Sequence, residues 1–190
     1  MILQQVHTLQ TDRLTLRAFR REDLADFYEY SKNPNVGPRA GWAPHTSLLE
    51  ARQVLSSLRK RMAWAIVEKS TDRLIGTIDL HQDQIRPTIG VLALGYSLAE
   101  STWGRGYATE AARELVRHVF EDLQLPVLAA NHYVTNPASG RVLQKCGFRL
   151  EGTLRQAGKL FDDSVYDRVC YSITREEYDQ QQRENKKGSV

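Results

Sequence analysis

The sequence predicts a single-domain protein of the α/β (α+β) class. Three observations support this fold class. The chain has 190 residues, which is the usual length of one domain. Its composition, 41% hydrophobic and 26% charged, is close to the average of globular domains. Segments with the two-residue period of strands also alternate along the chain with segments that have the period of helices.

In the N-terminal half, strands alternate with helices around one long loop. Residues 33–47 hold three prolines and two glycines among few apolar residues, which indicates a loop, and Ser47 at its end is a suitable helix cap. The β-branched runs that follow are separated by Ser70-Thr71-Asp72, which predicts a hairpin. The elements expected here are strands over 14–18, 64–67, 74–81 and 91–98, and helices beginning near 24 and over 47–60.

The C-terminal half begins with the clearest helix of the chain. From Ala108 to Leu123 the apolar residues recur on one face, and charged residues occupy the other. Strands are then expected over 127–134, from Phe148 onward and over 164–174, with a helix over 137–145. We therefore expect about seven strands in one domain over residues 1–178. Residues 179–190 have no apolar periodicity and predict a flexible tail.

Charge and cysteine content exclude several functional classes. The 26 basic and 23 acidic residues give a net charge of +3, and stretches such as Arg20-Arg21-Glu22-Asp23 mix the two signs. We therefore expect no DNA binding. Cys146 and Cys170 stand alone, so neither a metal site nor a disulfide framework is indicated. No segment has the length and apolarity of a signal peptide or membrane span, so we expect a cytoplasmic protein.

A glycine-rich turn, Gly104-Arg105-Gly106, lies between a predicted strand and the clearest helix. Such a turn can present free backbone N–H groups at the positive end of a helix, which favours an anion, typically a phosphate. Glycine permits positive φ and the close approach of a ligand. An ordinary strand-to-helix turn remains the alternative. A dinucleotide site is disfavoured, because the turn is too short for the G-x-G-x-x-G pattern.

The segment LGYSLAESTWGRGYATEAARELVRHVF resembles motif A of the GNAT superfamily of N-acetyltransferases, with its pyrophosphate-binding loop. Trp103 stands where most members have Arg or Gln, which is similar to the RimJ/RimL-like branch of ribosomal-protein-alanine N-acetyltransferases. The resemblance implies a mixed sheet that is splayed between its central strands, with helices on both faces, and acetyl-CoA as cosubstrate. It places the pyrophosphate of CoA at Trp103, Gly104, Arg105, Gly106, Tyr107, Ala108 and Thr109.

A second segment supports the same resemblance. Asn136-Pro137-Ala138-Ser139, followed by Cys146-Gly147-Phe148, is similar to the N-x-x-S helix of that branch. The resemblance implies that Asn136 binds the pantetheine arm and that Ser139 lies near the CoA sulfur. Arg141 and Lys145 lie four residues apart on one face of the same predicted helix and are candidates to meet the CoA phosphates, with solvated surface cations as the alternative. The exposed edge of the splayed strand, at Tyr96, Ser97 and Leu98, would pair with pantetheine amides. Asn136 as a simple helix cap is equally compatible with the sequence.

The expected reaction is direct attack of a primary amine, either a protein N-terminus or a small molecule, on the acetyl thioester. Many superfamily members carry a Tyr donor at the position of Leu143, which leaves Ser139 as the candidate hydrogen-bond donor to the sulfur. Relatives often carry a carboxylate at Ala93, so the candidate base becomes Asp79 with His81, which share one face of a strand. A CoA-binding module without turnover remains the alternative.

The acceptor wall is expected from two loops. Trp42 and His45 of the 33–47 loop and Phe161 of the last predicted turn are the candidates, and His45 is also a third candidate base. The sequence leaves the acceptor amine open, and either a monomer or a homodimer is expected.

Overall fold

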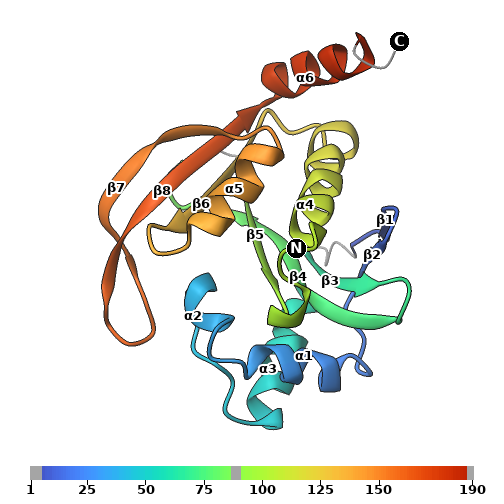
Figure 1. The fold of residues 1–190 in the computed structure, drawn as a ribbon, viewed down its shortest axis with the longest axis vertical. Coiled ribbons are helices and arrows are strands. Elements are labelled where there is room, and N and C mark those ends of the chain that lie inside the picture. Colours follow the sequence, from blue (N-terminus) through green and yellow to red (C-terminus); the bar gives the residue numbers. More distant parts are fainter. Residues whose placement is uncertain (1–5, 87–90, 188–190) are drawn as a thin grey trace.

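A computed structural model of the chain describes residues 6–86 and 91–187. Its strands form one sheet in the order β1-β2-β3-β4-β5-β6-β8-β7 (Figure 1). Every neighbouring pair is antiparallel except β5 and β6, so the sheet is mixed, as expected. The strands are β1 (Leu9–Gln10), β2 (Leu14–Arg17), β3 (Ala63–Glu68), β4 (Arg73–Gln82), β5 (Leu92–Leu98), β6 (Val127–Tyr133), β7 (Arg149–Lys159) and β8 (Val165–Thr174).

Among the residues that the structure describes, the sheet has eight strands, where the sequence predicts about seven. The additional strand is β1, whose Leu9 pairs with Leu16 of β2. Two residues are too short to carry a recognisable alternation of apolar and polar side chains. The other strands lie where the sequence predicts them, and β3 and β4 form the expected hairpin.

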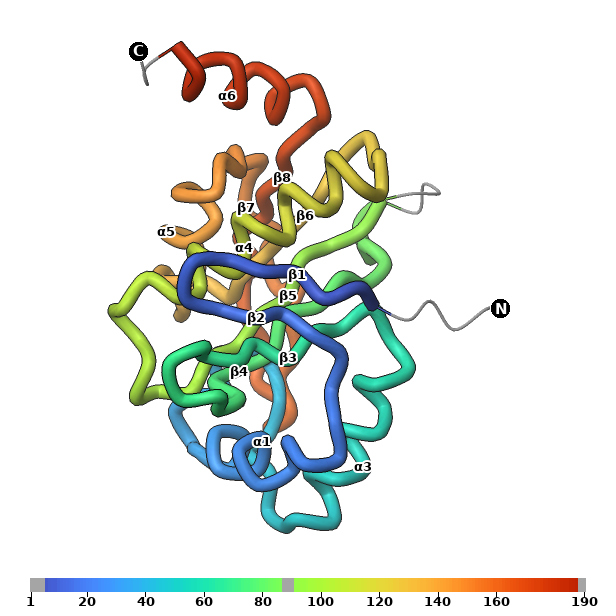
Figure 2. The backbone as a smooth tube through the Cα atoms, turned by 90° about the vertical axis from the view of Figure 1, so that its right-hand side faces the viewer, coloured from blue at the N-terminus to red at the C-terminus, as the bar shows by residue number. Residues whose placement is uncertain are grey.

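Helices cover both faces of the sheet, as Figure 2 shows from the side. Ala63, Ala65 and Val67 of β3 pack with α1 and α3, whereas Trp64 and Ile66 pack on the opposite face with α4. This alternation explains why β3 is apolar at nearly every position, since both of its faces are buried. The helices are α1 (Leu24–Ser31), α2 (Gly37–Ala40), α3 (Leu48–Leu58), α4 (Tyr107–Arg117), α5 (Pro137–Lys145) and α6 (Arg175–Lys187).

The loop over residues 33–47 is more ordered than expected. It contains the short helix α2, which ends at Gly41 with φ of 90°. Ser47 caps α3 as predicted, because its side chain accepts a hydrogen bond from the Glu50 amide at 3.2 Å. The connection is therefore an ordered segment, and it places α2 beside β5.

The two central strands diverge from each other. Backbone pairing between β5 and β6 runs only from Leu92 to Leu94. Beyond that point β5 continues to Leu98 against β4, and β6 continues to Tyr133 against β8. A wedge therefore opens from Gly95 onward, which confirms the expected splay.

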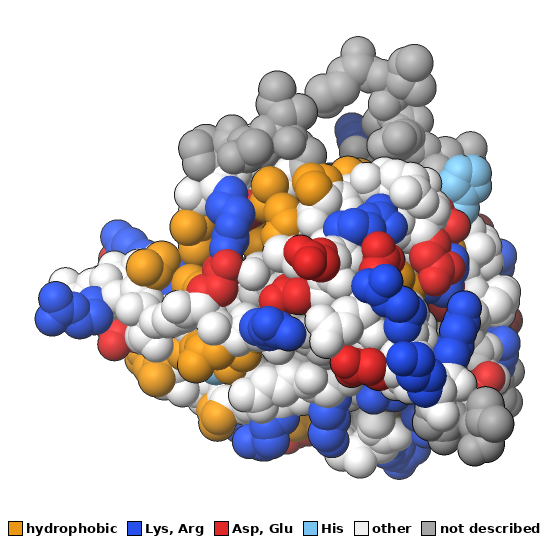
Figure 3. Space-filling view, turned by 90° about the horizontal axis from the view of Figure 1, so that it is seen from above, with side chains coloured by type: hydrophobic (Ala, Val, Ile, Leu, Met, Phe, Trp, Pro, Cys, Tyr) orange, Lys and Arg blue, Asp and Glu red, His pale blue; other side chains and the backbone are white. Residues whose placement is uncertain are grey.

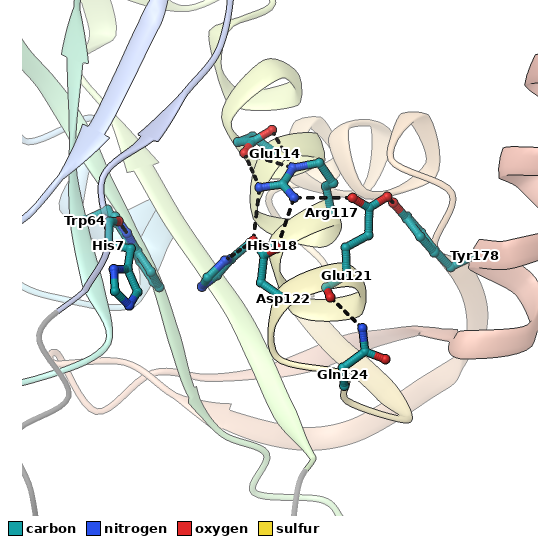
Figure 4. Close-up of polar contacts among 9 residues, drawn as sticks. All are labelled: His7, Trp64, Glu114, Arg117, His118, Glu121, Asp122, Gln124 and Tyr178. Carbon is teal, nitrogen blue, oxygen red and sulfur yellow. Dashed lines mark hydrogen bonds and ion pairs between the residues drawn. The ribbon is translucent and has the colours of Figure 1, made fainter.

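The C-terminal segment differs from the flexible tail that the sequence predicts. Residues up to Lys187 belong to α6, and residues 188–190 lie outside the described part. Tyr178 stacks on Phe120 with ring centroids 4.9 Å apart. Its hydroxyl donates to Glu121 at 2.7 Å (Figure 4). Gln181 also donates to the Gly147 carbonyl at 3.1 Å. The helix forms because its start is packed and its polar faces are solvated, which apolar periodicity does not detect.

The surface beside α6 carries charges of both signs. In Figure 3, Lys and Arg side chains alternate with Asp and Glu and form no continuous basic stripe on that face. Figure 4 shows one such network, in which Arg117 contacts Glu114, Glu121 and Asp122. Within the described residues, no helix is both long and apolar enough to cross a membrane.

Candidate active site

A cavity of about 570 Å³ occupies the wedge between β5 and β6. Its walls also include α2, the turn before α4 and the start of α5. The residues predicted from the sequence that line it are His81, Tyr96, Ser97, Leu98, Trp103, Gly104, Gly106, Tyr107, Ala108, Thr109, Asn136, Ser139 and Arg141. The structure therefore brings together most of the residues that two separate motifs predict.

The glycine turn has the geometry of an anion site. Gly104 and Gly106 have φ of 75° and 82°, a region that residues with a Cβ rarely adopt. Gly106 precedes α4, and no side chain caps the first turn of that helix. The amides of that turn therefore face the cavity at the positive end of the helix dipole. Arg105 does not line the cavity, and its carbonyl accepts from Arg13 Nη1 at 3.0 Å.

The side chain of Trp103 forms a hydrogen bond with the last residue of the splayed strand β5. Its Nε1 donates to the Leu98 carbonyl at 2.9 Å, and the Arg39 guanidinium lies 5.2 Å from the Trp103 ring centroid. The Leu98 carbonyl thus already has a partner from its own chain. Tyr96 and Ser97 remain as the strand edge that can pair with a ligand.

Asn136 acts as the cap of α5. Its Oδ1 accepts from the Ser139 amide at 3.4 Å, and its Nδ2 donates to the Arg39 carbonyl at 3.1 Å. The side chain therefore also ties α5 to α2. Arg141 and Lys145, farther along the same helix, place positive charge at the cavity rim.

A pair of hydroxyl groups lies on the α4 and α5 side of the wedge. Tyr96 Oη is 2.7 Å from Ser139 Oγ and donates to the Ser139 carbonyl at 3.0 Å. Burial raises the pKa of Tyr96 far above its ordinary value, so the phenol stays protonated at neutral pH. This pair is not predicted from the sequence. The available signal is that Tyr96 carries the one hydroxyl among the inward-facing positions Leu94, Tyr96 and Leu98.

An imidazole–carboxylate pair lies on β4. His81 Nδ1 is 2.9 Å from Asp79 Oδ2, so the two side chains share a face, as expected, and also contact each other directly. The Asp79 hydrogen bond raises the pKa of His81 above its ordinary value, and partial burial opposes the rise. Gly95 lies opposite Asp79, and a Cβ there would come within 2.6 Å of Asp79 Oδ1. The glycine therefore makes room for the carboxylate.

The hydroxyl pair and the His81 pair lie on opposite faces of the sheet. Tyr96 packs with the core under α4, whereas Gly95, its neighbour in the strand, contacts Asp79 and His81. Successive side chains of a strand point to opposite faces, so these two contacts assign the faces directly. The wedge at Gly95 and Tyr96 is the opening that connects them.

The expected acceptor wall needs correction. Trp42 packs against Tyr30 and His45 in the core beneath α1 and α3 and does not line the cavity. His45 is 8% exposed between Phe27 and Trp42, and burial lowers its pKa. Phe161 is exposed in the turn between β7 and β8, outside the cavity. Trp42 and His45 lie away from the cavity because their rings pack against Tyr30 and Phe27 of α1.

Neither cysteine is paired, and both are buried. Burial raises the pKa of Cys146 to about 12, so its thiol is unreactive. Among the residues described here, no group of three or more His, Cys, Asp or Glu side chains is arranged to hold a metal ion.

Comparison with known proteins agrees with this geometry. The family described as the acetyltransferase (GNAT) domain matches residues 13–149. The protein named "Uncharacterized N-acetyltransferase p20" of Bacillus licheniformis is 30% identical over 91% of this chain and 99% of its own length. The ribosomal-protein-serine acetyltransferase of Escherichia coli is 37% identical over 52% of each chain.

Solved structures agree in fold. An acetyltransferase of the GNAT family from Bacillus anthracis superposes with a TM-score of 0.81 at 21% identity, covering 90% of this chain and 99% of that one. The acetyltransferase from Agrobacterium tumefaciens superposes with a TM-score of 0.68 at 27% identity, covering 89% and 95%. With the family match, the splayed sheet and the glycine turn all in agreement, this chain is an N-acetyltransferase of the GNAT family.

Proposed function

We propose that the protein transfers the acetyl group of acetyl-CoA to a primary amine by direct attack of the amine on the thioester. One observation carries this proposal. The wedge at Gly95 and Tyr96 has a proton acceptor, His81, on one face of the sheet and a proton donor, Tyr96, on the other. Acyl transfer from a thioester to an amine is assisted by a base that takes the proton of the amine and by a donor that stabilises the departing sulfur.

The chain's own groups fit the cosubstrate. The uncapped first turn of α4, between Gly106 and Thr109, can bind the pyrophosphate of CoA through backbone amides. Tyr96 and Ser97 can pair with pantetheine amides along the open edge of β5. Acetyl-CoA supplies the activated acetyl group when it is bound.

His81 serves as the base. Its Nδ1 is held by Asp79, which leaves Nε2 to accept a proton from the incoming ammonium, directly or through a water molecule. Asp79 fixes the orientation of the ring and stabilises the imidazolium that results. The neutral amine then attacks the carbonyl carbon of the thioester, and the C–S bond breaks. The nitrogen gives its second extra proton to the departing CoA thiolate, and the proton held by His81 is lost to solvent.

Tyr96 serves as the donor to the departing sulfur. A thiol has a pKa near 8.5, so the thiolate is a tolerable leaving group and a hydroxyl donor suffices. The short contact between Tyr96 Oη and Ser139 Oγ lets either hydroxyl reach the sulfur while the other supports it. Ser139, the donor expected from the sequence, thus acts together with the Tyr96 hydroxyl.

The amine acceptor is proposed at the level of class: an α-amine of a protein or a small-molecule amine. One relative is named a ribosomal-protein-serine acetyltransferase, which supports a protein acceptor. Another is named "FsC-acetyl coenzyme A-N(2)-transacetylase", so the named relatives are not limited to ribosomal proteins. Cytoplasmic location and oligomeric state stay predictions.

The experiment combines calorimetry with acetyl-CoA and a thiol-release assay over a panel of amines. Binding of acetyl-CoA together with amine-dependent release of CoA is expected. Binding without release for every amine would instead support the CoA-binding module without turnover.

A further inference from the structure

Arg168, which no motif singled out, lies in the wall of the active-site cavity. It sits on β8 directly opposite Tyr133, the last residue of β6. The next pair along these two strands is His132 of β6 and Val169 of β8, and Val169 packs with the core on the α4 side. Strand alternation therefore turns Arg168 to the other face, the face of Asp79 and His81.

The Arg168 guanidinium is not satisfied by the chain. Its Nε is buried and has no hydrogen-bond partner. Its Nη1 contacts Gln84 Oε1 at 3.4 Å, near the limit of a hydrogen bond. Its Cζ lies 5.7 Å from the Tyr133 ring centroid, which supports the group from one side. A buried N–H of a charged group without a hydrogen-bond partner costs free energy, so the Arg168 Nε points to a ligand that supplies an acceptor.

The carboxylates near Arg168 already have partners. Arg86 pairs with Asp83 at 2.9 Å and also with Glu151. Within residues 6–86 and 91–187, Arg168 takes part in no ion pair of its own. The positive charge at this end of the cavity is therefore free to meet an anion from outside the chain.

Gly158 of β7 makes space for this arrangement. A Cβ at Gly158 would come within 2.4 Å of Tyr133 Cε1 and 3.1 Å of Arg168 Nε. Any side chain there would displace the Tyr133 ring from its place beside the guanidinium. Arg168 and Tyr133 can therefore keep this arrangement because the backbone of β7 passes close to both of them at Gly158.

We propose that the acceptor is a small amine that carries a carboxylate, and that Arg168 binds this carboxylate while the amine lies at His81. This inference rests on the proposed acetyl transfer and adds the substrate class to it. The two residues share a face and a cavity, and the Arg168 charge is close enough to oppose the rise in the pKa of His81. A guanidinium matches the planar geometry of a carboxylate and can hold it with two hydrogen bonds.

The test uses matched pairs of amines, each an ω-amino acid and its carboxamide of equal chain length, such as 5-aminovalerate and 5-aminovaleramide. Binding of each to the CoA-bound protein is measured by calorimetry, and kcat/KM by thiol release. We expect the acid to bind about 10-fold to 100-fold more tightly than the amide. Arg168→Gln should remove this preference by weakening the acid alone, and Arg168→Lys should restore part of it.

Two controls keep the test decisive. Arg52→Gln, on an exposed position of α3, should leave the preference intact. Acetyl-CoA affinity should be the same in the Arg168 variants and the wild type, which shows that they are folded. Equal loss for acid and amide in Arg168→Gln, or no preference for the acid in the wild type, would overturn the proposal. Because the calorimetric comparison needs no turnover, failure of catalysis is distinguishable from failure of carboxylate binding.

Discussion

The hydroxyl of Tyr96 lies 2.7 Å from that of Ser139, although the two residues are 43 positions apart in the chain. Tyr96 comes from the splayed strand β5 and Ser139 from the first turn of α5. Leu143, at the position where the family resemblance implies a tyrosine, is 1% exposed and belongs to the core. A phenol therefore lies beside Ser139, but it comes from the strand β5 and not from the helix α5.

Tyr96→Phe removes the donor and keeps the ring. We expect kcat to fall by about 10-fold to 100-fold while KM for acetyl-CoA changes little, because the hydroxyl acts on the departing sulfur. Ser139→Ala should lower kcat less, since Tyr96 remains. Steady-state thiol release measures both values. Unchanged kcat in both variants and in the double variant would exclude the hydroxyl pair from the reaction.

The His81–Asp79 pair predicts a specific pH dependence. His81 acts as a base only when neutral, and Asp79 raises its pKa, so activity should increase with pH through a midpoint above about 6.5. Asp79→Asn removes the charge that favours the imidazolium, so the midpoint should move to lower pH. The acceptor's own titration is common to both enzymes and cancels in the comparison. His81→Gln is the control, and it should remove the increase of activity with pH that His81 causes. If Asp79→Asn leaves the midpoint unchanged, His81 is not the base.

Gly104→Ala tests the backbone of the glycine turn. The position has φ of 75°, and a Cβ would meet no atom within 4 Å, so its effect comes from the backbone conformation and from a bound ligand. We expect a loss of about 1 kcal/mol in stability and about a 10-fold increase in the Kd of acetyl-CoA. Gly152→Ala is the matched control, because φ there is 154° with equally open space. Equal acetyl-CoA affinity in the two variants would argue against a ligand at this turn.

Substitutions of Tyr178 test whether α6 contributes to the stability of the domain. The side chain is 5% exposed against Phe120, so Tyr178→Ala should lower the free energy of unfolding by about 3 kcal/mol. Tyr178→Phe keeps the ring contact and loses the hydrogen bond to Glu121, at a cost of about 1 kcal/mol. Chemical denaturation measures both. A change below 1 kcal/mol for Tyr178→Ala would show that α6 contributes little to the domain.

Local features were predictable from the sequence because each depends on a few adjacent residues. The Ser47 cap needs one side chain and the amide three residues later. The absence of a Cβ at Gly104 and Gly106 permits the positive φ that both residues adopt. The two-residue period of one strand places Asp79 and His81 on the same face.

The errors concern residues whose neighbours are far away in the chain. Trp42 and His45 belong to an irregular loop and were expected at the cleft, but packing with Tyr30 and Phe27 turns them into the core. Residues 179–187 lack an apolar stripe, yet contacts made by Tyr178 and Gln181 dock the helix. Burial against distant elements leaves no periodic signal in the segment itself.

By itself, the sequence determined the fold class, the glycine turn and the family, because these depend on local conformation and on motifs of a few residues. Only the tertiary structure decided which groups meet across the wedge. Tyr96 reaches Ser139, and Arg168 reaches the face of His81, through strand register and the divergence of β5 from β6. Register is set by pairing and core packing over the whole sheet, so these contacts arise only once the chain has folded.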